Sequence, residues 1–206
     1  GLVGVRTPYD VPKNAINKDI IPGGSSSGSS VAVSHQFVAF SLGTDTAGSG
    51  RIPAALNNIV GLKPTLGALS KRGVVPACLT LDTVSIFALN INDAYNIYNV
   101  ASQYDEKDPY SIKKPELKYK STQDVVVAIP NLESQIFFND KIQEKSYLST
   151  VDLIKAKGFK TVEIDLKPFF EVAELLYEGS WVAERYSVIE EMMKNQADNI
   201  LEVTRK

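Results

Sequence analysis

The sequence has little of several residues on which common kinds of site depend. Its 206 residues include one cysteine, Cys78, one histidine, His35, and one tryptophan. A single cysteine excludes an internal disulfide framework and suits a reducing cytosol. A site for zinc or a similar metal would need a cluster of histidine and cysteine ligands, so we expect no metal site.

Charge of one sign and long apolar runs are also missing. The 22 Lys and Arg residues nearly balance the 24 Asp and Glu residues, which leaves a formal net charge of -2. This balance gives no reason to expect nucleic acid or an acidic membrane surface as a partner. No apolar run approaches the roughly 18 residues of a membrane span, and no signal peptide is visible. With 44% hydrophobic residues, the chain has enough apolar material for a globular core.

Glycine and serine, by contrast, are concentrated in two turns. Gly23–Ser30 contains Gly-Gly-Ser-Ser-Ser-Gly-Ser-Ser, and Gly43–Pro53 contains Gly-Thr-Asp-Thr-Ala-Gly-Ser-Gly-Arg-Ile-Pro. The segment 31–42 between them is too apolar for a linker and long enough for a helix. We therefore expect each turn at the end of an ordered element, where backbone N–H groups are free. Composition alone leaves open a flexible linker followed by an ordinary loop.

Two kinds of chemistry use turns of this type. A phosphate-binding loop needs a closing Lys-Ser or Lys-Thr pair, and neither turn has this pair or the Gly-x-Gly-x-x-Gly dinucleotide fingerprint. Acyl transfer needs a serine nucleophile at a tight turn, with neighbouring backbone N–H groups that hold the oxyanion. Ser49 fits this second requirement, because Gly48 permits a sharp bend just before it.

A serine nucleophile also needs a base. His35 is the only histidine available for a Ser-His-Asp arrangement, but in a helical connector it lies well beyond the Gly/Ser loop and points away from it. We therefore interpret His35 as a structural or surface residue, and we expect activation by a desolvated, neutral lysine. Cys78 is an alternative nucleophile, but no histidine is placed to activate it.

At this point the residues resemble the amidase signature family of Ser-Ser-Lys hydrolases. The match is Gly-Gly-Ser-Ser-Ser-Gly-Ser followed by Gly-Thr-Asp-Thr-Ala-Gly-Ser-x-Arg-x-Pro-Ala, and it extends over about residues 1–100. The resemblance implies that Ser49 is the nucleophile and that Ser25, which should follow a cis peptide bond, is the bridging serine. It also implies an oxyanion hole of backbone N–H groups and three supporting side chains. These are Thr46, Ala47, Gly48 and Ser49 for the oxyanion hole, and Ser26, Asp45 and Arg51 for support.

The family resemblance also implies the fold. We expect an α/β amidase signature fold with a central mixed, mostly parallel β-sheet flanked by helices, and residues 1–206 as part of one such domain. The family's catalytic lysine should come from a segment upstream of Gly1, so the chain by itself should be catalytically incomplete. The lysines that do not match its position are Lys13, Lys18, Lys63 and Lys71. No metal or organic cofactor is implied.

A narrower resemblance is to the allophanate hydrolase branch of this family. It rests on Val75-Pro-Ala-Cys78, on Ser85-Ile-Phe-Ala88 and on Leu176-Tyr-Glu-Gly-Ser-Trp-Val-Ala-Glu-Arg-Tyr186. In that branch Tyr177 and Arg185 match residues that hold the substrate. Allophanate carries a carboxylate beside its amide, and the planar arginine side chain can bind a carboxylate with two parallel hydrogen bonds. If the segment is one helix, the spacing places both side chains on one side.

This branch implies an amide hydrolase that releases ammonia, and ultimately carbon dioxide, from allophanate in cytoplasmic urea degradation. The implied partner is a biotin-dependent urea carboxylase, either fused or separate, and a homodimer is compatible with the resemblance. Two alternatives stay open. One is another amidase, including the amidotransferase subunit that makes ammonia for misacylated tRNA. The other is a non-catalytic fragment that lacks the lysine.

Periodicity and turn signals predict the remaining elements. One helix each is expected over residues 26–40, 52–58, 93–103 and 141–157, with Asn92 as the cap of the third, and helices in the plural are expected over 169–196. Strands are expected just before Thr44, over 125–129 as a buried strand, and over 161–166. The last two strands and the helix between them should form a parallel βαβ unit. The polar segment 104–123 is interpreted as an exposed linker or flexible insertion.

Overall fold

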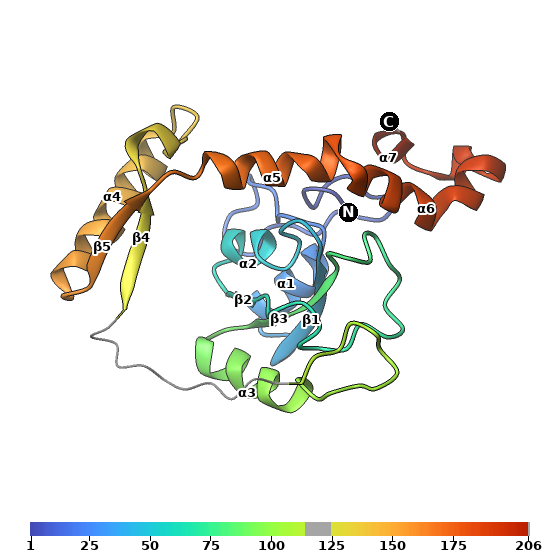
Figure 1. Cartoon of the computed structure of the whole chain (residues 1–206), viewed down its shortest axis with the longest axis horizontal. Helices are drawn as coiled ribbons and strands as arrows, with labels where there is room; N and C mark the ends of the chain where they lie inside the picture. Colours follow the sequence, from blue (N-terminus) through green and yellow to red (C-terminus); the bar gives the residue numbers. More distant parts are fainter. Residues whose placement is uncertain (114–124, 206) are drawn as a thin grey trace. The chain divides into compact units, whose positions relative to one another are not determined.

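The computed structural model describes residues 1–113 and 125–205 of the chain (Figure 1). The chain divides into two compact units. The first comprises residues 1–115 and 181–206, and the second comprises residues 116–180. Within the described ranges, no helix is both long enough and apolar enough to cross a membrane.

The first unit is built around a three-stranded antiparallel sheet in the order β1-β3-β2. Its strands are β1 (Phe40–Asp45), β2 (Val60–Leu62) and β3 (Thr83–Ala88). The central strand β3 pairs with β1 from Phe40↔Ala88 to Asp45↔Thr83, and with β2 from Val60↔Ala88 to Leu62↔Ile86. Five of the six residues of β3 are buried, as expected for a strand with a neighbour on each edge.

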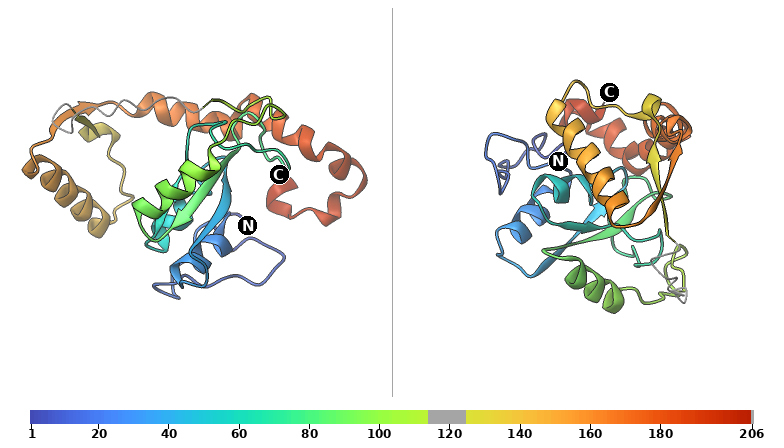
Figure 2. Two further views of the ribbon diagram at one scale, coloured as in Figure 1. Left: turned by 90° about the horizontal axis from the view of Figure 1, so that it is seen from below. Right: turned by 90° about the vertical axis from the view of Figure 1, so that its left-hand side faces the viewer.

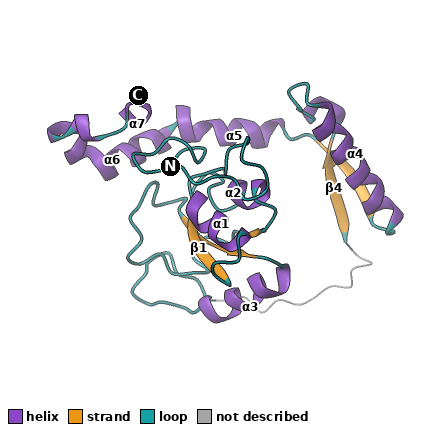
Figure 3. Ribbon diagram, turned by 180° about the vertical axis from the view of Figure 1, so that it is seen from behind, coloured by secondary structure: helices purple, strands orange, loops and turns teal. Residues whose placement is uncertain are grey.

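Helices cover both faces of this sheet (Figure 1 and Figure 3). They are α1 (Ser27–Ser34) and α2 (Ile52–Leu56) on one face and α3 (Ile91–Ala101) on the other. Phe87 of β3 forms a buried cluster with Val33 of α1 and Ala54 of α2. Its neighbour Ile86 belongs to a second cluster, against which Ile97 of α3 packs. Successive strand residues point to opposite faces, so these two adjacent side chains anchor the two helical layers.

The ends of two helices differ from the sequence prediction. Helix α1 stops at Ser34 instead of continuing to about residue 40, because the backbone turns into the left-handed region at Gln36 (φ 61°) before β1 begins. Helix α3 begins at Ile91, and its N-cap is Asn90 rather than Asn92. The Asn90 side chain accepts a hydrogen bond from the Asp93 N–H at 2.9 Å, which satisfies a helix donor that otherwise has no partner.

Residues 104–113, the described part of the polar segment 104–123, are mostly exposed but make specific contacts with distant residues. Asp105 accepts hydrogen bonds from Ser70 Oγ at 2.8 Å and from Arg72 Nε at 2.9 Å. Asp108 is buried and accepts a bond from the Lys71 N–H at 2.8 Å. The composition of the segment did not show these hydrogen bonds, because the partners of Asp105 and Asp108 are more than 30 residues away in the sequence. Residues 114–123 of the predicted linker lie outside the described residues.

The second unit contains the predicted βαβ arrangement (Figure 2). The strands β4 (Val126–Pro130) and β5 (Lys160–Ile164) are parallel, and α4 (Lys141–Ala156) connects them after the short 3₁₀ helix Leu132–Ser134. Gly158 ends α4 with a φ of 83°, as its position in the sequence predicts. The prediction that β4 is buried is wrong for this structure, since β4 pairs with one described strand and Val126 is 56% exposed.

The remaining helices follow in chain order. Helix α5 (Lys167–Glu178) belongs to the second unit, and α6 (Ser180–Asn195) begins at the boundary and lies otherwise in the first. The short 3₁₀ helix Ala197–Asn199 and α7 (Glu202–Arg205) complete the first unit. Antiparallel and parallel strand pairs together with these helices confirm the mixed α/β class.

Candidate active site

The serine-rich loop before α1 is an ordered part of the first unit. Ser27 Oγ donates to the Gly23 carbonyl at 2.6 Å, and Ser30 Oγ donates to the Pro53 carbonyl at 2.8 Å. Both of these serines are buried. A flexible Gly/Ser linker does not pair its hydroxyl groups with fixed backbone partners in this way. The alternative of a linker at this position is therefore wrong.

The two turns predicted from the sequence lie against each other. Ser26 Oγ donates to the carbonyl of Thr44 in β1 at 3.2 Å instead of capping α1. Gly43 permits this approach, since a Cβ atom there would lie 2.6 Å from Ser26 Oγ. At its other end, α1 is tied to the chain after the second turn, where Ser34 Oγ donates to the Asn57 carbonyl at 2.8 Å. The serine side chains thus hold the two turns together.

Ser25 is exposed and follows a cis Gly24–Ser25 peptide bond, as the family resemblance implied. It lines a cavity of about 300 Å³ together with Ser27, Gly28 and residues of the loop 1–12. Ser25 therefore borders a cavity that could hold a small molecule.

Ser49 lies on the turn that follows β1, and the carboxylate of Asp45 organises this turn. Asp45 is 1% exposed. Its two oxygens accept hydrogen bonds from the N–H groups of Gly48 at 2.8 Å and Gly50 at 3.1 Å, on either side of Ser49. The same oxygens accept bonds from Arg51 Nε at 2.8 Å and Arg51 Nη2 at 2.9 Å. The predicted supporting roles of Asp45 and Arg51 therefore have a geometric basis.

Gly48 makes the sharp bend that the sequence predicted before Ser49. Its φ is 116°, and a Cβ atom there would lie 2.7 Å from Ile52 Cδ1. One expectation needs correction, because the Gly48 N–H points to Asp45 and is already paired in this structure. The prediction of oxyanion donors is thereby reduced to the N–H groups of Thr46, Ala47 and Ser49, and for these three it stays a prediction.

The environment of Asp45 keeps its carboxylate charged. Burial favours the neutral form and is the largest single influence on the pKa of Asp45, but the bonds from Arg51, Gly48 and Gly50 outweigh it together. The resulting pKa lies below the ordinary value of 3.8. The hydrogen bond to Asp45 correspondingly raises the pKa of Arg51.

This lowered pKa makes the contribution of Asp45 to stability dependent on pH. The group contributes fully above its unfolded pKa of about 4, and the contribution is lost as the pH falls toward the folded pKa. At pH 7 we expect Asp45→Asn to lower the free energy of unfolding by about 1.5–3 kcal/mol. We expect a value near the low end of this range, because the Arg51 side chain is 54% exposed and water screens the Arg51–Asp45 ion pair. The measurement is the thermal midpoint of wild type and of Asp45→Asn at pH 7 and at pH 3. The difference between the two midpoints should be smaller at pH 3.

The exposed carboxylate of Asp19 provides the control for this prediction. Asp19→Asn should change the midpoint little at either pH, because its side chain is open to solvent. A stability gap between wild type and Asp45→Asn that is as large at pH 3 as at pH 7 would contradict the ionic role of Asp45.

The two residues expected to hold the substrate lie on different helices. Tyr177 is exposed near the end of α5 in the second unit, and Arg185 is half-buried on α6 in the first unit. The single helix considered in the sequence analysis does not form, because Gly179 between them has an extended backbone (φ -112°, ψ -166°). The argument that both side chains share one side of a helix is therefore wrong.

Asp82 joins the site although the sequence analysis did not single it out. It is 3% exposed, and its carboxylate accepts a hydrogen bond from Thr46 Oγ1 and another from the Ala77 N–H at 2.8 Å. The pairing of Asp45 with Thr83 at the end of the β1–β3 ladder explains why Thr46 lies beside Asp82. This contact follows from the register of two strands that are far apart in the chain, and no local sequence pattern predicts it.

Comparison with known proteins identifies the family. The model of the family "Amidase" matches residues 1–206, the whole chain. The chain belongs to the amidase family. It is 44% identical over 200 residues to the urea amidolyase of Saccharomyces cerevisiae, covering 95% of this chain and 11% of that protein. It is also 35% identical over 162 residues to the A-type subunit of the glutamyl-tRNA(Gln) amidotransferase of Neorickettsia sennetsu, covering 77% of this chain and 33% of that relative.

Solved amidase structures agree with this assignment. The selenomethionine-substituted allophanate hydrolase of Kluyveromyces lactis has a TM-score of 0.88 and 45% identity, covering 99% of this chain and 33% of that chain. The A-type subunit of the Thermotoga maritima glutamyl-tRNA(Gln) amidotransferase has a TM-score of 0.70 and 26% identity, covering 93% of this chain and 41% of that chain. The chain thus spans about a tenth of the urea amidolyase and about a third of the allophanate hydrolase.

The structure also shows the surroundings of the other candidate residues. His35 is exposed, follows the last turn of α1 and stacks on Phe37 with ring centroids 5.3 Å apart, so it is a surface residue as interpreted. Cys78 is fully buried, and burial is the main cause of the raised pKa of its thiol. Both effects disfavour a nucleophilic thiolate.

Two lysines of this amidase have structural partners. Lys63 Nζ donates to the Pro64 carbonyl at 2.8 Å. Lys71 is 7% exposed, donates from Nζ to the Leu79 carbonyl and lies 3.6 Å from the centre of the Tyr110 ring. These contacts agree with the expectation that neither lysine is the catalytic base.

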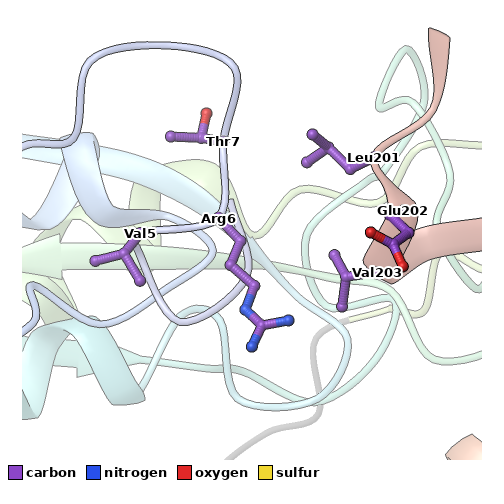
Figure 4. A pocket seen from close by; sticks show the side chains of 6 residues that line it. All are labelled: Val5, Arg6, Thr7, Leu201, Glu202 and Val203. Atoms are coloured by element: carbon purple, nitrogen blue, oxygen red, sulfur yellow. The ribbon is translucent and has the colours of Figure 1, made fainter. Parts of the chain in front are cut away.

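The first unit also has a cavity that the sequence did not predict (Figure 4). It has a volume of about 390 Å³ and is lined by Val5, Arg6, Thr7, Leu201, Glu202 and Val203. None of its lining residues belongs to the predicted catalytic or substrate-binding set.

Proposed function

We propose that this chain is part of an allophanate hydrolase, an amide hydrolase that cleaves the terminal amide of allophanate and releases ammonia. The observation that carries the proposal is the arrangement of the two serine turns. Ser25 opens to a cavity from one turn, and Asp45 braces the second turn on both sides of Ser49. The 45% identity to the allophanate hydrolase of Kluyveromyces lactis supports the choice of substrate.

The proposed reaction begins with proton transfer from Ser25 to a neutral lysine. Ser25 then accepts the proton of Ser49, and Ser49 Oγ attacks the carbon of the terminal amide. The N–H groups of Thr46, Ala47 and Ser49 stabilise the negative charge that forms on the oxygen. Losing one such donor typically costs about 2.7–4 kcal/mol of activation free energy. Ser25 returns a proton to the leaving ammonia, and water then hydrolyses the acyl–Ser49 ester to release the acid.

The base in this proposal is the lysine of the amidase signature family, which we expect in a part of the full-length protein that this chain does not include. Lys63 and Lys71 are poor candidates because their Nζ atoms already donate to backbone carbonyls. We also propose that both compact units belong to one amidase domain, in a cytoplasmic protein. The family model that matches residues 1–206 supports the single domain.

A urea carboxylase is the proposed partner. The urea amidolyases of Saccharomyces cerevisiae and Lachancea kluyveri are 44% and 45% identical to this chain, and the chain covers 11% and 10% of them. We propose that such a carboxylase supplies allophanate, either from the same polypeptide or from a separate one.

The A-type amidotransferase function remains the second candidate. The chain is 47% identical over 105 residues to the A-type subunit of the mitochondrial glutamyl-tRNA(Gln) amidotransferase of Candida albicans. This match covers 51% of the chain. That function would require glutamine as the ammonia donor. Ammonia release from allophanate, malonamate, glutamine and the neutral amide malonamide, measured with the full-length protein, separates the two. We expect strong preference for allophanate, and preference for glutamine would reject the proposal.

Arg185 provides a sharper test of the substrate. We propose that its guanidinium binds the substrate carboxylate, with Tyr177 as a second contact. Charge-assisted hydrogen bonds of this kind contribute about 1.5–3 kcal/mol, so Arg185→Ala should raise KM for allophanate and malonamate about 10- to 100-fold. Its effect on malonamide, which has no carboxylate, should be small.

Arg72 is the matched control, since it is an exposed arginine that pairs with Asp105. Arg72→Ala should leave both KM values unchanged. Equal losses on malonamate and malonamide in the Arg185→Ala protein would show that Arg185 supports the fold and does not bind the carboxylate.

A further inference from the structure

The loop 77–82 before β3 is closed by its own last residue. The Asp82 carboxylate accepts hydrogen bonds from the N–H groups of Ala77 at 2.8 Å and Cys78 at 3.1 Å. The N–H groups of Leu81 and Asp82 donate in turn to the Cys78 carbonyl at 2.9 and 2.8 Å. Six consecutive residues therefore form one compact turn around a buried carboxylate.

The same carboxylate reaches the turn that carries Ser49. Thr46 Oγ1 donates to Asp82 Oδ1, and Thr46 is the first of the retained oxyanion donors. A fixed hydroxyl limits rotation of the Thr46 backbone, so this bond helps to set the direction of its N–H. Asp45 holds the far end of the same turn at Gly48 and Gly50. Two separate carboxylates thus anchor the oxyanion donors.

The loop 77–82 also binds helix α6, within the same compact unit. The Glu184 carboxylate accepts bonds from the Thr80 N–H at 2.8 Å and from Thr80 Oγ1 at 2.7 Å. Two bonds to one residue restrict both the position and the rotation of the helix at this turn. Glu184 is the residue immediately before Arg185.

A third contact also holds the loop. The buried Lys71 donates from Nζ to the carbonyl of Leu79, which lies between Cys78, bound by Asp82, and Thr80, bound by Glu184. The loop is therefore tethered along its length and can transmit the position of one attachment to the other.

We propose that the loop 77–82 sets the position of Arg185 relative to the oxyanion donors, with Asp82 and Glu184 as its positioning residues. The proposal rests on the proposed function, because Arg185 and the oxyanion turn need a common substrate. It assigns the two carboxylates different effects. Asp82 acts through Thr46 on the transition state and so on kcat, whereas Glu184 acts through Arg185 on binding of the substrate carboxylate and so on KM.

The first test is a double-mutant cycle on Asp82 and Thr46 in the full-length protein. Asp82→Asn and Thr46→Val should each lower kcat for allophanate about 10- to 100-fold, less than the full loss of a donor. In the Thr46→Val background, Asp82→Asn should lower kcat by less than about 3-fold, because the contact is already gone. Thr46→Ser restores the hydroxyl and should recover most of the kcat lost in Thr46→Val.

Asp105→Asn is the control for Asp82. Asp105 also accepts bonds from a hydroxyl, Ser70 Oγ, and a backbone N–H, that of Lys107, so its loss disturbs a similar turn. Its kcat should equal that of wild type. Additive losses in the cycle, or no recovery with Thr46→Ser, would overturn the role of Asp82. Thr46→Val keeps the test decisive if Asp82→Asn fails to fold, since it leaves the turn around Asp82 intact.

The second test concerns Glu184. Glu184→Ala should raise KM for allophanate and malonamate about 10-fold, change kcat by less than about 2-fold and leave malonamide unaffected. Glu190→Ala is the matched control, because Glu190 lies on the same helix and pairs with Lys194 at 2.6 Å. Its KM should be that of wild type. Wild-type KM in Glu184→Ala, or equal losses on malonamide, would overturn the role of Glu184.

The inference and the proposed function fail in different ways. If Ser49→Ala retains activity, the proposed function fails whatever the kinetics of the Asp82 and Glu184 variants. If Ser49→Ala is inactive and the Asp82 and Glu184 variants have wild-type kinetics, the positioning role alone is rejected.

Discussion

Replacing Ser49 by alanine should abolish ammonia release from allophanate, with a loss of at least about 10⁴-fold in kcat. The reason is that Ser49 Oγ forms the bond to the substrate carbon, and a neighbouring water cannot take its place in the turn held by Asp45. The fold should persist, because the change removes one hydroxyl from a half-buried side chain. Ammonia release and the thermal midpoint of the full-length protein measure both parts of the prediction.

Ser41→Ala is the matched control. Ser41 is a half-buried serine of β1 whose Oγ donates to the Ser29 carbonyl at 2.8 Å, outside the catalytic set. Its activity should be close to that of wild type. Turnover in Ser49→Ala well above about 0.01% of wild type would remove Ser49 from the role of nucleophile.

Replacing Ser25 by alanine should lower kcat for allophanate by about 10³–10⁴-fold. Ser25 is proposed to carry a proton twice, from Ser49 during attack and to the leaving ammonia, and general acid–base catalysis contributes typically 10²–10⁴-fold. In an ester of the same acid with an activated phenol, the leaving group is a phenolate, which departs without taking up a proton. Hydrolysis of this ester should fall by about 10-fold less than amide hydrolysis does.

This comparison separates a proton carrier from a residue that only shapes the loop. Ser34→Ala serves as the control, because Ser34 lies on α1 and its Oγ donates to the Asn57 carbonyl at 2.8 Å. It should affect amide and ester alike and only slightly. Equal losses on amide and ester in Ser25→Ala would argue that Ser25 does not deliver the proton to the leaving group.

Much of the fold could be predicted from local sequence. The unit β4-α4-β5 was expected almost residue by residue, because its alternating and helical periodicities lie within short windows and Gly158 marks the end of the helix. The bend at Gly48 was also predictable, since its φ of 116° requires glycine. The motif that connects Ser25 and Ser49 pointed to acyl transfer and to the family.

Other features depend on partners that are distant in the chain. The end of α1 depends on how β1 enters the sheet, and the buried position of Asp108 depends on the turn at Lys71. The break at Gly179 separates two segments that each have helical periodicity. Local pattern contains no information about such contacts, so neither the end of α1 nor the partners of Asp108 could be predicted from it.

The sequence by itself determined the family, the two serines proposed for catalysis and the mixed α/β class, because these follow from short motifs and local periodicity. The tertiary structure decided which side chains support the site. Asp82 meets Thr46 because Asp45 pairs with Thr83 in the sheet, and Gly48 donates its N–H to Asp45 because the turn folds back on the strand. Such contacts arise from strand register and backbone direction, and these exist only when the whole sheet has formed.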